Sequence, residues 1–163
     1  MLREKDLDES SLLEMAIKIK EITDRYGKKL IVNNNIAVAN SVKAYGVQLS
    51  MGRLKSIDAC ATKVGVSVHS YEEAIRSIRC GADYLIASHM FDTDCKPGLP
   101  PKGVRLIKAI RRASSIPIIG LGGITKENCH EPIEAGAQGI AVMSGPMRER
   151  KTEAYIRNFN EKL

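Results

Sequence analysis

Apolar residues follow two patterns along this chain, and each pattern predicts one kind of secondary structure. Short runs rich in β-branched residues predict buried strands, at about residues 29–33, 46–49, 64–69, 84–89, 116–121 and 139–143. Apolar residues that recur every three or four positions predict helices, at about residues 6–25, 35–44, 51–61, 70–81, 103–113 and 152–163, with another beginning at Thr125. Six strands that alternate with helices indicate an α/β protein with a parallel sheet.

Helix boundaries can be placed from a few local signals. Gly27 closes the first helix, and Ser70 with Glu73 forms a capping box for the helix that ends near Gly81. Pro132 lies in the helix that begins at Thr125. An interior proline removes a backbone hydrogen bond and costs about 3 kcal/mol, so we expect a kink there.

Two architectures fit this alternation, an open doubly wound sheet and a closed β/α barrel. The length of 163 residues favours the open sheet, because a complete barrel needs eight units and about 250 residues. In both architectures ligands bind at the carboxyl ends of the strands. The location expected for the site is therefore independent of this choice.

Composition narrows the class of protein. A chain of this size with 44% hydrophobic residues suits a single domain over residues 1–163. The charged N-terminus and the lack of an apolar run of about eighteen residues lead us to expect a cytoplasmic protein without membrane contact. The four cysteines form no C-x-x-C pair, so we expect reduced thiols rather than a zinc site or a disulfide framework.

The net charge of +6 is compatible with nucleic acid, an anionic surface or a phosphorylated substrate. Only 4% of the residues are aromatic, which leaves few platforms on which bases can stack, and no helix-turn-helix or zinc-finger spacing is visible. We therefore expect no nucleic-acid partner. A solvated basic surface explains much of the charge.

Reactive side chains are concentrated just after the strand at residues 84–89. His89 ends that strand, where an imidazole can take and return a proton at neutral pH. The competing interpretation is a core histidine bonded to a carbonyl. Thr93 and Lys96 follow closely and can fix an anionic substrate, whereas Cys95 has no neighbour that would activate its thiol. His69 and His130 are interpreted as structural or exposed.

Glycine-rich turns follow the next two strands. Gly122-Gly123 and Ser144-Gly145 let backbone N–H groups approach a phosphate, and barrels often hold phosphate in the loops after their last two strands. The alternative is that strand ends need glycine simply to turn.

Five motifs together resemble the thiamin phosphate synthase and TenI superfamily along nearly the whole chain. They are R-E-K-D-L at 3–7, G-V-S-V-H-S at 65–70, H-M-F-D-T-D-C-K-P-G at 89–98, G-L-G-G-I-T at 120–125 and A-V-M-S-G at 141–145. The resemblance implies a TIM-type β/α barrel, which overrides the preference for an open sheet. It also implies that this barrel is incomplete, lacking the first strand, the first helix and most of the second strand, with Leu2 and Arg3 as the tail of that strand.

Two activities have to be separated within this superfamily. The synthase joins a pyrimidine diphosphate to a thiazole phosphate with magnesium, and its pattern has Asn-Asp after the third strand and Gly-Gln-Glu-Asp after the fourth. The corresponding segments here read Asn33-Asn34 and 50–53, Ser-Met-Gly-Arg. Neutral Asn34 and cationic Arg53 thus stand where carboxylates would bind the divalent ion. The family's glutamine before L-R-E-K is Met1 in this chain.

The histidine at position 89 resembles TenI-type thiazole tautomerases, whereas synthases usually have Gly-Pro at that place. We therefore expect an isomerase of thiamin biosynthesis that aromatises a carboxylated thiazole phosphate tautomer, with His89 as the proton shuttle and with no metal and no cofactor. Substrate and phosphate contacts are expected from Arg3, Lys5, Asn33, Thr93, Lys96, Gly122, Gly123, Ser144 and Gly145. The alternatives are a diverged thiamin phosphate synthase and a phosphate-binding relative without turnover. Open sheet edges lead us to expect a homo-oligomer, or a natural chain longer than this one.

Overall fold

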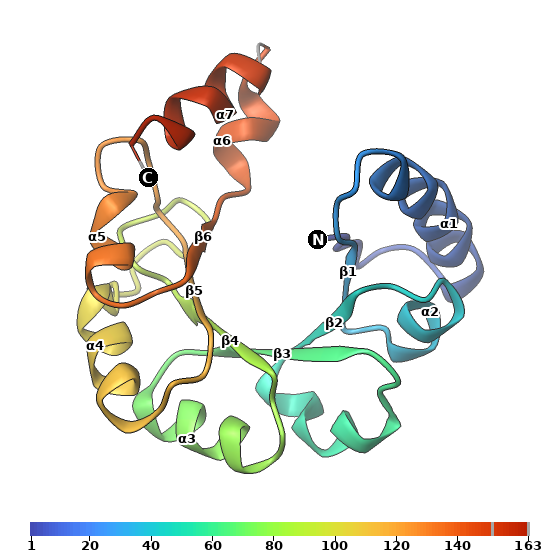
Figure 1. The fold of residues 1–163 in the computed structure, drawn as a ribbon, viewed down its shortest axis with the longest axis horizontal. Coiled ribbons are helices and arrows are strands. Elements are labelled where there is room, and N and C mark those ends of the chain that lie inside the picture. Colours follow the sequence, from blue (N-terminus) through green and yellow to red (C-terminus); the bar gives the residue numbers. More distant parts are fainter. Residues whose placement is uncertain (151, 163) are drawn as a thin grey trace. The chain divides into compact units, whose positions relative to one another are not determined.

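The computed structural model describes residues 1–150 and 152–162, which form two compact units. Residues 1–67 and 77–83 make up the first unit. Residues 68–76 and the chain from Tyr84 onward make up the second. Each of the six strands predicted from the sequence is present in the described residues (Figure 1).

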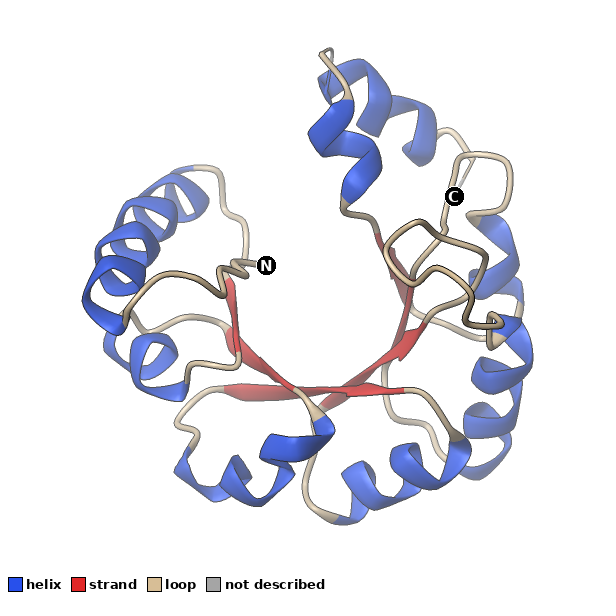
Figure 2. Cartoon of the chain, turned by 180° about the vertical axis from the view of Figure 1, so that it is seen from behind, coloured by secondary structure: helices blue, strands red, loops and turns tan. Residues whose placement is uncertain are grey.

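The first unit is built on three parallel strands in chain order: β1 (Ile31–Asn33), β2 (Gly46–Leu49) and β3 (Lys63–Val68), whose last residue belongs to the second unit. Leu2 pairs in parallel with Val32, as expected for the tail of a preceding strand. The helices are α1 (Glu9–Arg25) and α2 (Ile36–Ser41), which lie on the same face of the sheet (Figures 1 and 2), and the 3₁₀ helix η1 (Met51–Ala59).

Side-chain caps begin two of these helices. The Asp8 carboxylate accepts a hydrogen bond from the Ser11 N–H at 2.8 Å, so α1 begins at Glu9 rather than at residue 6. The Asn35 amide oxygen accepts from the Val38 N–H, also at 2.8 Å, and begins α2. These caps satisfy N–H groups that the helices cannot pair internally.

An ion pair lies where β3 begins. The Asp83 carboxylate accepts hydrogen bonds from the Lys63 ammonium at 2.6 Å and from the Val64 N–H at 2.8 Å. Partial burial raises the pKa of Asp83, but the Lys63 and Val64 hydrogen bonds outweigh it and the pKa lies below its ordinary value. Asp83 therefore stabilises the start of β3 in its ionised form.

The second unit repeats the pattern with β4 (Tyr84–Ser88), β5 (Ile118–Leu121) and β6 (Gly139–Ala141), which pair in parallel in that order. Its helices are α4 (Gly103–Ala113), α5 (His130–Glu134), α6 (Ser144–Arg148) and α7 (Thr152–Asn160), together with residues 71–76 of α3 (Tyr71–Arg79). Figure 2 shows α4 and α5 on the same face of this sheet.

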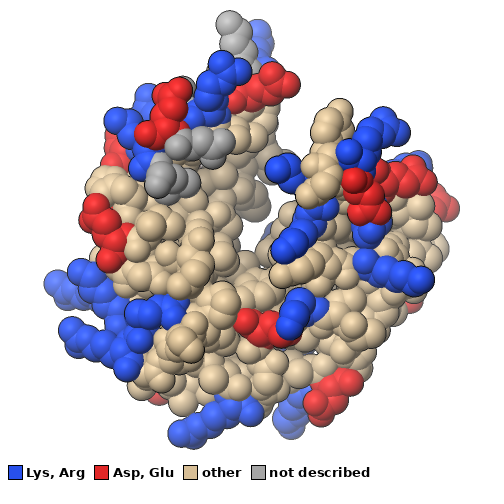
Figure 3. Space-filling model, viewed as in Figure 1, with Lys and Arg blue, Asp and Glu red and all other residues tan. Residues whose placement is uncertain are grey.

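Helix α4 has one buried face and one basic face. Leu106, Ile107 and Ile110 are buried. Arg105 and Lys108 are exposed on the other side, and Figure 3 shows Lys and Arg side chains gathered over this helix. Within the described residues, no helix is both long enough and apolar enough to span a membrane.

The Arg111 guanidinium, at the end of α4, connects segments that are distant in sequence. It donates to the backbone carbonyls of Gly136, Ser114 and Ile116 at 3.2, 3.0 and 2.8 Å. It also donates to the side-chain oxygen of Gln138 at 2.9 Å, and that oxygen accepts from the N–H of Ile118 at the start of β5. One side chain thus joins the end of α4 to the segments that lead into β5 and β6.

Three elements differ from the sequence-based expectation. The segment from Met51 is a 3₁₀ helix, with a glycine in its first turn at position 52. The kink expected at Pro132 is absent because α5 begins only two residues earlier, at His130. Backbone N–H groups in the first turn of a helix have no intrahelical partner, so the N–H that Pro132 lacks costs α5 no hydrogen bond. The short helix α6 follows β6 closely and was not expected.

Candidate functional site

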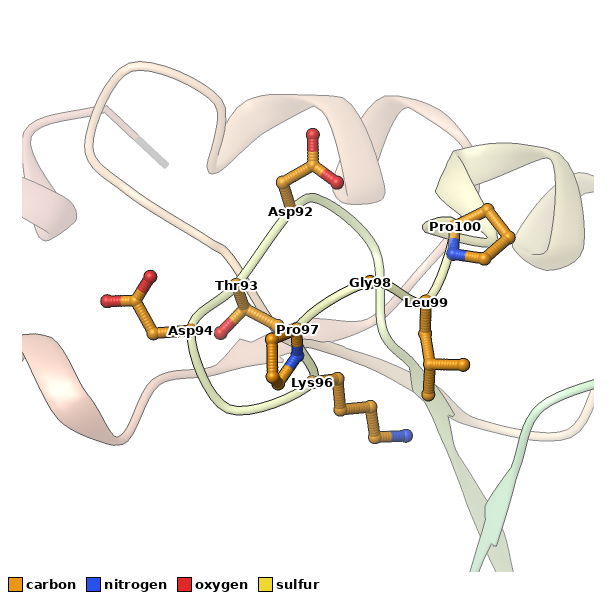
Figure 4. Close-up of a pocket in the computed structure, with 8 residues that line it drawn as sticks. All are labelled: Asp92, Thr93, Asp94, Lys96, Pro97, Gly98, Leu99 and Pro100. Atoms are coloured by element: carbon orange, nitrogen blue, oxygen red, sulfur yellow. The ribbon is translucent and has the colours of Figure 1, made fainter.

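The loop after β4 surrounds an open pocket of about 450 Å³. Its lining residues are Asp92, Thr93, Asp94, Lys96, Pro97, Gly98, Leu99 and Pro100. The Thr93 carbonyl accepts from the Lys96 N–H at 3.0 Å, and the Thr93 hydroxyl accepts from the Cys95 N–H at 3.3 Å. In Figure 4 the side chains of Lys96 and Leu99 extend on one side of the loop, whereas Asp92 points to the other. The loop therefore places the side chains of Lys96 and Thr93 in the lining of one pocket.

His89 is almost fully buried, with 3% of its surface exposed. Its Nε2 atom lies 3.1 Å from the carbonyl oxygen of Leu99, so Nε2 carries a hydrogen and donates it to that carbonyl. The His89 carbonyl accepts from the Lys102 N–H at 2.9 Å. This is the arrangement of the competing interpretation, a core histidine bonded to a carbonyl. The side chain holds the pocket loop against the end of β4.

Gly122 and Gly123, after β5, lie directly against the chain that follows β4. A Cβ atom on Gly122 would lie 2.5 Å from the Cβ of His89. One on Gly123 would collide with the backbone carbonyl oxygens of Phe91 and Asp92, and both glycines have positive φ angles. Close packing thus requires these two glycines, whatever the loop binds. A phosphate contact here remains a prediction.

Ser144 and Gly145 begin α6, and α7 contacts them through Tyr155. The Tyr155 hydroxyl occupies the space that a Cβ on Gly145 would need, and the Tyr155 ring packs on the ring of buried Phe159 at 5.2 Å between centroids. Arg148 of α6 lies 3.7 Å from the Asp94 carboxylate. Seven of the expected site residues thus belong to the second unit, on segments that follow β4, β5 and β6: His89, Thr93, Lys96, Gly122, Gly123, Ser144 and Gly145.

The other three expected contacts lie in the first unit. Arg3 and Lys5 are exposed. Asn33, at the end of β1, donates to the backbone carbonyl of Gln48 at 3.3 Å. Gln48 is 2% exposed and donates to the Ser67 hydroxyl at 3.0 Å, while its buried Oε1 atom has no hydrogen-bond partner among the described residues. Gln48 was missed from the sequence because a single glutamine in an apolar run gives no signal of its own.

The two segments that carry carboxylates in the synthase pattern are adjacent in this unit. The Asn34 side-chain oxygen accepts from the Ser50 N–H at 2.9 Å, and its backbone N–H donates to the Gln48 carbonyl at 2.8 Å. Asn34 and Ser50 are neutral, and Arg53 is an exposed cation. No cluster of three potential His, Cys, Asp or Glu ligands occurs in the part of the chain that the structure describes. These residues do not fit a magnesium ion, which prefers carboxylates.

His69 is a second polar residue that the sequence did not mark as functional. It directly follows β3, and its Nδ1 atom lies 2.7 Å from the carbonyl oxygen of Ser88, the last residue of β4. Its backbone N–H donates to the Glu73 carboxylate at 2.6 Å. The contact with Ser88 bridges nineteen positions in sequence, so no local pattern reveals it.

Comparison with curated proteins gives relatives with a consistent name. The chain is 36% identical to the thiamine-phosphate synthase of Clostridium acetobutylicum, over 96% of this chain and 76% of the relative. It is 38% identical to that of Chloroflexus aurantiacus, over 96% and 75% of the two chains, and 36% identical to that of Methanoculleus marisnigri, over 99% and 80%.

Solved structures agree with these relatives. A thiamine phosphate pyrophosphorylase from Pyrococcus furiosus superposes with a TM-score of 0.85 and 28% identity, covering 98% of this chain and 79% of that one. A 3-hexulose-6-phosphate synthase, with a TM-score of 0.71 and 16% identity, shares the fold alone. These matches confirm an α/β fold of the TIM-barrel type, and this chain spans about four fifths of the length of the Pyrococcus furiosus protein.

The tautomerase expectation is wrong, because the curated relatives are named thiamine-phosphate synthase. His89 was the residue that decided the sequence-based choice of a tautomerase, and its Nε2 hydrogen is donated to the Leu99 carbonyl inside the protein. A catalytic role for His89 remains a prediction. The model of the family described as thiamine monophosphate synthase matches residues 1–145. The chain belongs to the thiamine monophosphate synthase and TenI family.

Proposed function

We propose that this chain is a thiamine phosphate synthase, a transferase that joins a pyrimidine diphosphate to a thiazole phosphate. The observation that carries the proposal is the agreement of relatives 34–38% identical over 88–99% of this chain, all of which are named thiamine-phosphate synthase. In the joining reaction a bond forms between the thiazole and the pyrimidine's side carbon, and the bond from that carbon to the diphosphate oxygen breaks.

The second unit supports this proposal through the chemistry of its loops. In the proposed complex the Lys96 ammonium and the Thr93 hydroxyl bind the phosphate of the thiazole substrate. The turns at Gly122-Gly123 and Ser144-Gly145 hold it in place with backbone N–H groups. A charge-assisted hydrogen bond contributes about 1.5–3 kcal/mol, so Lys96 is the contact whose loss weakens binding most.

The first unit departs from the family pattern at the magnesium-binding positions. Asn34 and Arg53 replace carboxylates, and the Asn34 oxygen is already bonded to the Ser50 N–H. No step of the reaction is assigned to a metal bound at these residues. A divalent ion carried by the diphosphate itself would enter with the substrate.

The test is whether the protein forms thiamine phosphate from thiazole phosphate and pyrimidine diphosphate. The reaction is run once with magnesium and once with a chelator, and the product is measured by chromatography. Lys96→Met should raise the KM for thiazole phosphate about tenfold or more. The matched control is Lys102→Met, because Lys102 is also a lysine of the β4–α4 connection but does not line the pocket. Absence of product under every condition would overturn the proposed activity.

The departures at Asn34 and Arg53 favour one second candidate, a relative that binds phosphate ligands without turnover. Calorimetry separates the two candidates. Binding of thiazole phosphate, weakened by Lys96→Met, together with no product in the assay would establish the binding role.

A further inference from the structure

His69 has the geometry of a ligand-binding imidazole with a fixed tautomer. Its Nδ1 atom lies 2.7 Å from the Ser88 carbonyl oxygen and 3.2 Å from the Ser88 hydroxyl oxygen. A carbonyl oxygen can only accept a hydrogen bond, so Nδ1 carries the ring's hydrogen. In the neutral ring the other nitrogen, Nε2, then has a free lone pair.

The rest of the residue is held in place as well. The backbone N–H of His69 donates to the Glu73 carboxylate at 2.6 Å, and Glu73 belongs to the first turn of α3. The ring is half-buried. Among the described residues no hydrogen bond to Nε2 is found. A fixed ring with one bonded nitrogen and one free nitrogen is oriented to accept a hydrogen bond at the second.

The position of His69 in the fold points to a ligand as the donor. His69 directly follows β3, and its partner Ser88 ends β4, so the ring lies at the carboxyl ends of parallel strands. Ligands of α/β proteins bind at these ends. The peptide that joins Ser88 to His89 begins the segment that leads into the pocket loop.

We propose that Nε2 of His69 accepts a hydrogen bond from an N–H group of a bound heterocyclic substrate. The identity of that substrate rests on the proposed function. Neither an aromatic thiazole nor an aromatic pyrimidine ring carries a ring N–H, so the donor would be an exocyclic amino group. We assign it to an amino group on the pyrimidine diphosphate, because the loops after β4, β5 and β6 are already assigned to the thiazole phosphate. His69 is then a residue that selects the pyrimidine, and the phosphate loops of the second unit serve the other substrate.

The variant that tests this proposal is His69→Asn. The Asn side-chain nitrogen takes the place of Nδ1 and keeps the donation to Ser88, while the acceptor at Nε2 is lost. A neutral hydrogen bond contributes about 0.5–1.5 kcal/mol, so the Kd for pyrimidine diphosphate should rise up to about tenfold. The Kd for thiazole phosphate should not change. His130→Asn, at an exposed histidine of α5, is the control.

A purely structural role for His69 predicts the opposite pattern. His69→Asn would then bind both substrates as the wild type does, whereas His69→Phe, which also loses the bond to Ser88, would weaken both and lower the melting temperature. That result would overturn the proposal. Calorimetry of the wild-type protein with each substrate tests the proposed function separately from the role of His69, because that measurement involves no His69 variant.

Nitrogen-15 NMR of the histidine side chains gives a readout that does not depend on turnover. The expected spectrum of the unliganded protein has the His69 proton on Nδ1, and pyrimidine diphosphate should shift the Nε2 resonance upfield while thiazole phosphate leaves it in place. A His69 proton found on Nε2, or an Nε2 resonance unmoved by saturating pyrimidine diphosphate, would contradict the proposal.

Discussion

At the residue scale, Gly123 shows how closely the segments after β4 and β5 approach each other. Its φ of +66° disfavours any side chain, and a Cβ would collide with the carbonyl oxygens of Phe91 and Asp92. Gly27 provides a matched comparison, because its φ is +62° but a Cβ there would meet nothing within 4 Å. The two positions separate backbone strain from collision.

Gly27→Ala should lower the free energy of unfolding by about 1 kcal/mol, the cost of a left-handed backbone for a non-glycine residue. Gly123→Ala should lower it by about 3 kcal/mol, because overpacking against backbone adds to that strain. Urea unfolding followed by circular dichroism measures both. An equal loss of unfolding free energy in the two variants would show that the segment at Phe91 and Asp92 moves away from the added Cβ at no energetic cost.

Arg111 is a residue whose substitution should affect a whole region. Arg111→Ala should lower the free energy of unfolding by about 2 kcal/mol, because several backbone carbonyls lose a charged donor. The neighbouring Arg112 is exposed, so Arg112→Ala should change it by less than about 0.5 kcal/mol. Thermal melting of both variants provides the comparison, and a similar small effect for each would mean that water replaces the guanidinium.

At the element scale, the start of β3 should respond to acid through Asp83. The pKa of this carboxyl is lowered in the folded protein, so its stabilising effect is present at neutral pH. That effect is lost as the pH falls below the ordinary aspartate value, about 3.9, towards the lower folded value. The Lys63 partner is then no longer bonded to a carboxylate.

Asp83→Asn should therefore be less stable than the wild type at pH 7, and the difference should shrink as the pH falls below about 4. Asp92→Asn, at an exposed residue of the pocket loop, is the control and should follow the wild type. Denaturant midpoints measured across this pH range test the sign. A difference that grows on acidification would show that Asp83 does not act through its ionised form.

The elements differ in how far local sequence predicts them. The strands were found because β-branched runs such as residues 64–69 are local signals. The prediction of a kink at Pro132 was wrong because the position of Pro132 within α5 depends on where the preceding turn ends. The hydrogen bonds of Arg111, and the hydrogen bond that fixes the tautomer of His69, join segments up to 27 positions apart in sequence. They therefore follow from tertiary structure alone.

At the scale of the whole molecule, the single domain expected over residues 1–163 stays a prediction. If it holds, circular dichroism and tyrosine fluorescence should report one urea transition with the same midpoint. Tyr45 lies in the first unit and Tyr84 and Tyr155 lie in the second, so fluorescence samples both. Two separate midpoints would instead mean that the units unfold independently. The expected homo-oligomer is likewise a prediction, and light scattering measures it.

The hydrogen bond between Asn34 and Ser50 has a consequence for which residues position 34 can accept. An aspartate at position 34 could accept the same Ser50 N–H, so regaining that carboxylate would break no contact of the amide oxygen. Arg53 is exposed, and an acidic residue there would disturb no buried neighbour. Asn34→Asp and Arg53→Asp would therefore restore the acidic residues of the synthase pattern at positions where the structure offers no steric obstacle.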